Sequence, residues 1–160
     1  MKKSINILGL LCTMLLVLCV QASSQSYIEN ARFLPVAGVA CGTSTTLVNG
    51  TNFASAPVRV SHLGYDSIVA ITVTFTRTTG DANNVDFEFQ ASFDNGTTWD
   101  TAYYVRIQVA TNETADSNVV RKTSLVNVMG LSHLRLYRIK NNSGSIALTA
   151  CNATMSIGSK

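Results

Sequence analysis

The segment VDFEFQASF at residues 85–93 decides the fold, because its apolar and polar residues alternate strictly. Successive side chains of a β-strand point to opposite faces, so one face of this segment is apolar and the other is polar. The apolar face carries Val85, Phe87, Phe89, Ala91 and Phe93. The polar face carries Asp86, Glu88, Gln90 and Ser92. The pattern predicts a strand with one face in a hydrophobic core and the other towards solvent.

The same alternation recurs along the chain. Residues 69–76 and 103–109 each place four apolar side chains on one face. Further strands are expected at residues 45–48, 58–63, 119–128, 133–140 and 145–157. About eight strands separated by Asn- and Gly-rich turns predict an all-β fold, an antiparallel two-sheet β-sandwich. A jelly roll and an immunoglobulin-like topology both remain open, although Trp99 does not follow Cys41 as it would in an immunoglobulin domain.

The N-terminus has the layout of a secretory signal. Lys2 and Lys3 precede an apolar run over residues 5–20, and Val20-Gln21-Ala22 provides a cleavage site. The apolar run is shorter than the ~20 residues of a membrane-spanning helix, so a cleaved signal over residues 1–22 is favoured over a retained anchor. We expect residues 23–44 to form an N-terminal extension with a first strand, and residues 45–160 to form the β-sandwich. One domain of about 138 residues fits this length.

Charge is scarce in this chain. Only 13% of residues are charged, about half of the usual ~25%. Loss of Lys2 and Lys3 with the leader lowers the formal net charge from +3 to about +1. The longest basic run is Arg121-Lys122, and the cluster Arg135, Arg138 and Lys140 is short. Nucleic-acid binding needs several phosphate contacts on one face, so it is not expected.

Cys41 and Cys151 are the two cysteines beyond the leader. A pair of cysteines in an exported chain predicts one disulfide, here closing a loop of about 110 residues. Two buried free thiols are the alternative. Neither cysteine has a second Cys or His at ligand spacing, which argues against a zinc site.

Residues 92–99 read SFDNGTTW and predict a tight hairpin turn. Asp94 can accept backbone N–H groups across the turn, Gly96 can adopt a positive φ, and Trp99 can pack back over the turn. The segment resembles the Asp-box of sialidases and other secreted β-proteins, through Ser92, Asp94, Gly96, Thr98 and Trp99. The resemblance implies a turn structure. It does not imply glycosidase activity, because sialidases repeat the box in each propeller blade and this chain has one copy.

A broader pattern links SIVAITVTF (67–75), DANNVDFEFQASFDNGTTW (81–99) and HLRLYRIKNNSG (133–144). This order over residues 55–157 resembles small β-sandwich proteins of phage virions and secreted bacterial surfaces. The resemblance implies a role as a decoration or fibre component. The signal peptide departs from it, since virion proteins assemble in the cytoplasm.

Catalytic patterns are missing from the sequence. His62 and His133 are the two histidines. The sequence contains no nucleophile elbow (G-x-S-x-G), no zinc-protease motif (H-E-x-x-H) and no C-x-x-C motif. Asp86 and Glu88 would lie about 7 Å apart on one strand face, but any polar strand face produces such a pair. We therefore expect a protein that is not an enzyme and needs no cofactor.

Two groups of residues are candidates for ligand binding. Side-chain oxygens in residues 81–86 suit a Ca²⁺ ion. The candidate ligands are Asp81, Asn83, Asn84 and Asp86. The alternative is an Asx-rich turn that binds no ion. Outward aromatic rings could stack on sugars, with plain surface packing as the alternative; these are Tyr65, Tyr104 and Tyr137.

Threonines at 72, 74, 76 and 78 form a row typical of ice- or crystal-binding surfaces. Such surfaces need the row repeated on neighbouring strands. The polar face of residues 86–92 carries acids and Gln instead, which argues against this function.

These observations favour a noncatalytic secreted β-sandwich protein with a structural or adhesive role on a cell surface or particle, of virion decoration or fibre type. The alternative is a stand-alone carbohydrate-binding module. The expected partners are other protein subunits, including further copies of the chain, or surface glycans. Neither nucleic acid nor, after leader removal, a membrane is expected. An extracellular or periplasmic location follows from the leader.

Overall fold

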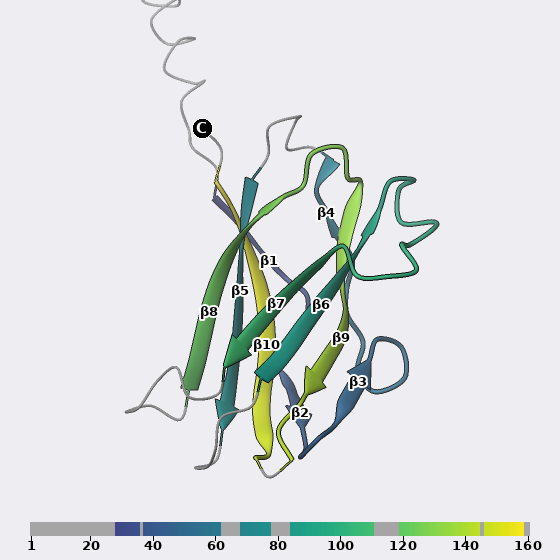
Figure 1. Cartoon of the computed structure of the whole chain (residues 1–160). Helices are drawn as coiled ribbons and strands as arrows, with labels where there is room; N and C mark the ends of the chain where they lie inside the picture. Colours follow the sequence, from purple (N-terminus) through teal and green to yellow (C-terminus); the bar gives the residue numbers. More distant parts are fainter. Residues whose placement is uncertain are drawn as a thin grey trace, which may run out of the picture.

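The computed structural model describes residues 28–35, 37–61, 68–77, 84–110, 119–144 and 146–158 (Figure 1). The expected leader, residues 1–22, lies outside these ranges. Ten strands in two antiparallel sheets make up the described part. Within it, no helix is long and apolar enough to cross a membrane. The predicted two-sheet antiparallel β-sandwich is therefore confirmed.

We call the first sheet sheet A. Its central strands are β10 (Leu148–Gly158) and β5 (Ile68–Arg77). β8 (Val119–Asn127) pairs with β5 and forms one edge. β1 (Ile28–Arg32) and β2 (Val39–Cys41) both pair with β10 and together form the other edge.

Sheet B lies against sheet A. Its central strands are β9 (His133–Asn141) and β6 (Asn84–Ser92). β7 (Val105–Ala110) pairs with β6 and forms one edge. β3 (Thr46–Val48) and β4 (Val58–Arg59) pair with β9 and form the other edge.

The strand order identifies the topology as a jelly roll. β1 and β2 share one position beside β10, and β3 and β4 share one position beside β9, so the ten strands fill eight positions. In chain order, sheet A holds the first, eighth, third and sixth positions, and sheet B holds the second, seventh, fourth and fifth. This is the connectivity of two Greek keys folded into a jelly roll. It decides between the two topologies that the sequence left open.

Several boundaries differ from the predicted strands. β1 and β2 precede residue 45, and both belong to the sandwich because they pair with β10. β6 ends at Ser92, so Phe93 stands exposed in the following turn instead of extending the apolar face. β7 begins only at Val105, and Tyr103 is likewise exposed. At both places the turn between β6 and β7 overrides the alternation.

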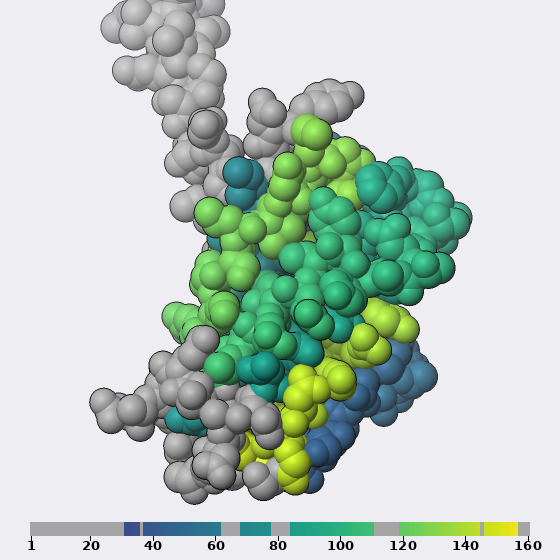
Figure 2. All heavy atoms as spheres, viewed as in Figure 1, coloured from purple at the N-terminus to yellow at the C-terminus, as the bar shows by residue number. Residues whose placement is uncertain are grey.

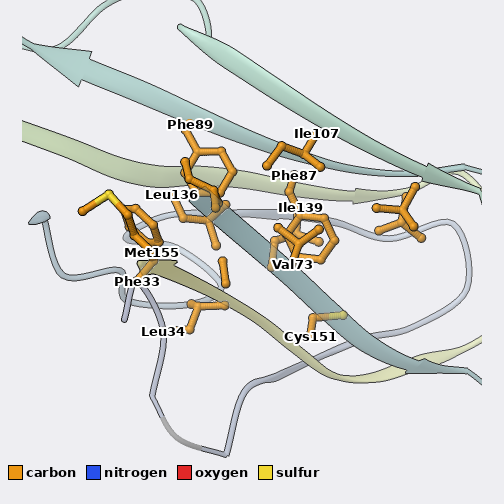
Figure 3. Packing of buried hydrophobic residues seen from close by; sticks show 14 of the residues in the cluster. Phe33, Leu34, Val73, Phe87, Phe89, Ile107, Leu136, Ile139, Cys151 and Met155 are labelled. Carbon is orange, nitrogen blue, oxygen red and sulfur yellow. The ribbon is translucent and has the colours of Figure 1, made fainter. Parts of the chain in front are cut away.

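Aromatic side chains join the two sheets in the core (Figure 3). Phe75 from β5 stacks on Phe87 from β6, with ring centroids 6.4 Å apart. Phe33, which follows β1, meets Phe89 from β6 edge-on at 5.0 Å. All four rings are buried. Burial of such apolar surface, at about 25 cal/mol per Å², holds the sheets together.

Candidate functional site

The outer face of sheet B carries a layer of buried polar side chains at its centre. Asp86, Glu88 and Gln90 point outward from β6, yet they are only 4%, 3% and 4% exposed. The predicted alternation is correct, but the predicted exposure of this face is wrong. Long side chains from β7 and β9, on either side of β6, cover it. We refer to these three residues as the polar layer.

Every member of the polar layer has a partner on a neighbouring strand or turn. Glu88 Oε2 accepts a hydrogen bond from Arg138 Nε at 2.7 Å and forms an ion pair with Arg138 Nη2 at 2.5 Å. Asp86 accepts one bond from Gln108 Nε2 at 3.0 Å and one from Asn142 Nδ2 at 3.1 Å.

Gln90 is bonded through both ends of its amide. Its oxygen accepts bonds from Arg135 Nε at 3.1 Å and Nη2 at 2.7 Å. Its nitrogen donates to the carbonyl of Asp100 at 2.7 Å. Buried polar groups are tolerated when they are paired in this way. The two carboxylates are therefore positioned to hold arginine and amide groups, and they do not line an open cleft as a hydrolytic pair would.

The turn over residues 92–99 is organised by Asp94. Its Oδ1 accepts the Thr98 backbone N–H at 2.8 Å and the Ser92 hydroxyl at 2.9 Å, and its Oδ2 accepts the Thr98 hydroxyl at 2.7 Å. Gly96 has φ +83° and donates its N–H to Ser92 Oγ at 2.9 Å. The hydrogen bonds from Thr98 lower the pKa of the Asp94 carboxyl to about 2.

Trp99 ends this turn beneath an arginine of β9. The guanidinium carbon of Arg135 lies 4.2 Å from the centroid of the Trp99 ring. On β7, the guanidinium carbon of Arg106 lies 5.4 Å from the centroid of Tyr103. These cation–π contacts were not predicted. Arg135 and Trp99 are distant in the sequence, and a strand beginning at Tyr103 would have placed Tyr103 and Arg106 on opposite faces, whereas β7 begins only at Val105.

Tyr104 and Tyr137, the two candidate sugar-stacking tyrosines within the described residues, do not form one platform. Tyr65 lies outside the described residues. Tyr104, just before β7, is exposed, and its hydroxyl donates to the carbonyl of Asn127, the last residue of β8 in sheet A, at 3.0 Å. Tyr137 lies half-buried on β9, at a bulge opposite Glu88 and Phe89, with β6 between it and Tyr104.

His133 begins β9 and pairs with Ser92 and Arg59 on the strands beside it. It is half-buried, and its Nδ1 is buried without a hydrogen-bond partner. The other histidine, His62, falls outside the described residues. Asp81 and Asn83 of the predicted Ca²⁺ loop also fall outside them. Asn84 is exposed at the start of β6, and Asp86 is engaged in the polar layer. Across the described ranges, no three His, Cys, Asp or Glu side chains gather as metal ligands would.

Cys41 and Cys151 face the interior from β2 and β10, and the structure holds them as free thiols. The two strands are direct neighbours. A bulge in β10 between Leu148 and Cys151 lets the side chains of Leu148 and Cys151 both face the interior. The thiols share a hydrogen bond. This bond and burial raise the pKa of Cys151, whereas the bond lowers the pKa of Cys41.

The outer face of sheet A has a different character. The threonine row lies on β5, whose neighbours are β10 and β8. The expectation that residues 86–92 lie beside this row is therefore wrong, because those residues belong to β6 in sheet B. Thr154, Thr72 and Thr123 stand side by side across these three strands. The hydroxyls of Thr72 and Thr123 lie 2.8 Å apart.

Apolar side chains are exposed at one end of the same face. Leu125 on β8 is 75% exposed, and Ile68 at the start of β5 is 58% exposed. Leu125 pairs with Ala70 across the sheet. None of the described side chains on this face is acidic.

A scan against protein-family models finds no match to this chain, and a search of curated proteins finds none either.

Proposed function

We propose that the protein is a noncatalytic structural or adhesive domain of a cell surface or particle. It acts through the flat outer face of sheet A, by association with other protein subunits. The exposure of Leu125, beside Ile68 and Ala70 on a face without described acids, carries this proposal. Exposed apolar side chains that cluster on one flat face are typical of protein–protein contacts.

The polar layer supports the noncatalytic part of the proposal. Asp86 and Glu88 are buried, and the amide or guanidinium groups beside them hold their oxygens. A general acid or base has to reach a substrate proton at hydrogen-bond distance. These two carboxylates instead serve the architecture of the sheet.

The test is the association state of the exported protein. Sedimentation over a range of concentrations should show self-association, or the protein should be retained with the surface or particle fraction of its cell. Leu125→Ser should weaken either association. Met129→Ser is the matched control, since Met129 is also exposed but lies in the turn after β8. A wild-type protein that stays monomeric and unretained would refute the proposal.

Carbohydrate binding is the second candidate function. The observation in its favour is the pairing of arginines with aromatic rings on the outer face of sheet B, Arg135 with Trp99 and Arg106 with Tyr103. Aromatic rings beside fixed polar groups are common in sugar-binding surfaces. Retention on a polysaccharide column that is lost on Tyr104→Ala or Tyr137→Ala would support it. Retention that survives both changes would exclude the tyrosines as the site.

A further inference from the structure

The outer face of sheet B collects positive charge from three separate parts of the chain. Five of the nine Arg and Lys residues in the described ranges lie on this face. They are Arg59 on β4, Arg106 on β7, and Arg135, Arg138 and Lys140 on β9. Figure 2 shows the side of the molecule on which β7 and residues 93–104 lie, in teal.

The acids on this face contribute little to what a ligand meets. Glu88 is bonded to Arg138 and Asp86 to the amides of Gln108 and Asn142, and both acids are almost fully buried. Asp94, at the rim, turns its carboxylate into its own turn, where Thr98 and Ser92 donate to it. Asp100 is half-buried beside Gln90. The accessible part of the face is therefore cationic, although the whole chain is nearly neutral without its leader.

Three of the guanidinium groups are held in place before any ligand binds. Glu88 fixes Arg138, while Gln90 and the Trp99 ring fix Arg135. The Tyr103 ring lies against Arg106. The bonds to Glu88 and Gln90 use Nε and one Nη of each arginine. A guanidinium has five N–H donors, so each arginine keeps donors for a partner, and prior ordering lowers the entropic cost of binding.

Charge complementarity selects an anionic partner for this face. Guanidinium groups bind carboxylate and sulfate groups through paired hydrogen bonds. The exposed ring of Tyr103 lies beside Arg106 at the margin, where the flat face of a sugar ring can pack. Because acidic groups and sugar rings occur together in acidic polysaccharides, we propose that the outer face of sheet B binds an acidic polysaccharide. This inference rests on the second candidate function, carbohydrate binding.

The test uses the full exported chain and polygalacturonate as the probe. Affinity electrophoresis or calorimetry at low ionic strength should show binding that weakens as salt is added. Neutral dextran should not bind. The double variant Arg106→Gln/Arg135→Gln should weaken binding on the order of tenfold, as expected for lost hydrogen bonds between charged groups.

The matched control is Arg32→Gln/Arg121→Gln. It removes the same charge from the outer face of sheet A. Its affinity for polygalacturonate should stay within about twofold of the wild type, because salt screens the effect of a change in net charge far from the site. If Arg106→Gln/Arg135→Gln fails to fold, Arg59→Gln/Lys140→Gln provides the second variant, because both of its side chains are exposed. That variant should also weaken binding severalfold.

Three results would overturn the inference. One is equal loss of affinity in the two double variants, and another is absence of polygalacturonate binding. The third is equal or tighter binding of single-stranded DNA of matched charge, which would show a general polyanion surface. Binding to neutral glycans but not to polygalacturonate would overturn this inference while leaving carbohydrate binding intact. Failure with every glycan would remove both, and the subunit-association proposal would stand on its own test.

Discussion

Oxidation of Cys41 and Cys151 to a disulfide should stabilise the folded protein strongly, and the expected size of this effect follows from their positions. The two thiols are buried neighbours on paired strands, so a bond between them needs little movement of the backbone. It would close a loop of about 110 residues, which the chain-entropy model values at about 4.7 kcal/mol. With an unfolding entropy of about 2.1 cal/mol/K per residue over the ~138 residues that follow the expected leader, this corresponds to roughly 15 °C in Tm.

The assay compares oxidised and reduced protein. Alkylation of the unfolded chain without reductant, followed by mass measurement, should detect no free thiol in protein from an oxidising compartment. Thermal unfolding with and without reductant should then differ by about 15 °C. The variant Cys41→Ala/Cys151→Ala is the control, and its Tm should not respond to reductant.

Reduced protein gives a second signature. The hydrogen bond to Cys41 and burial raise the pKa of Cys151, so little of the reactive thiolate forms in the folded state. Alkylation of reduced, folded protein should therefore be slow at Cys151 and become fast on unfolding. If both thiols of the exported protein are alkylated without reductant, or if the two Tm values agree within about 2 °C, the reasoning fails.

Three further predictions concern single residues. Gly38→Ala should lower the free energy of unfolding by about 2 kcal/mol or more, because Gly38 has φ +67° and a Cβ there would lie 2.7 Å from the Cys151 carbonyl oxygen. The control is Gly130→Ala, since Gly130 has φ +75° but no atom lies near the position of its Cβ. In the same denaturant titration this control should lower the free energy of unfolding by about half as much. The pKa of Asp94 is lowered to about 2 in the folded protein, from an ordinary value of 3.8, so its contribution is present above about pH 4 and is lost as the pH falls towards 2. Tm measured over pH 2–5 should therefore fall less steeply in Asp94→Asn than in the wild type, and identical slopes would count against this. Glu88→Gln should lower the free energy of unfolding in urea by about 1–3 kcal/mol. The loss should be smaller than for a fully buried ion pair, because the Arg138 side chain is 36% exposed. No measurable loss of stability would show that the pair contributes nothing.

The fold class could be predicted from the sequence because it depends on local periodicity. Alternation over residues 69–76 and 85–93 reports the two faces of β5 and β6 directly. The short strands β1 and β2 carry too few residues to show a period, and their strand state comes from pairing with β10. The jelly-roll order is likewise a property of non-local pairing.

The candidate sites show the same limit. The turn over residues 92–99 could be predicted because its hydrogen bonds are local, from Ser92 and Thr98 to Asp94. The meaning of the threonine row depended on knowing which strands flank β5, and no local pattern reports that. The cationic face was also invisible, because Arg59, Arg106 and the β9 cations come together only in the folded sheet.

The low charge of this chain therefore misrepresents its surface. A carboxylate on an outer strand face is ordinarily solvated and would offset nearby cations. In this sheet β6 is flanked on both sides by strands with long side chains, so Asp86 and Glu88 are almost fully buried and can persist there only because partners are fixed over them. Glu88 orders Arg138, and Asp86 is bonded to the Gln108 and Asn142 amides, while Arg135 and Arg106 are held by Gln90 and by aromatic rings. A count that sets each acid against each base would predict a neutral face, whereas burial of the acids leaves the cations facing outward. This asymmetry, and not the net charge, makes the outer face of sheet B suited to an anionic partner.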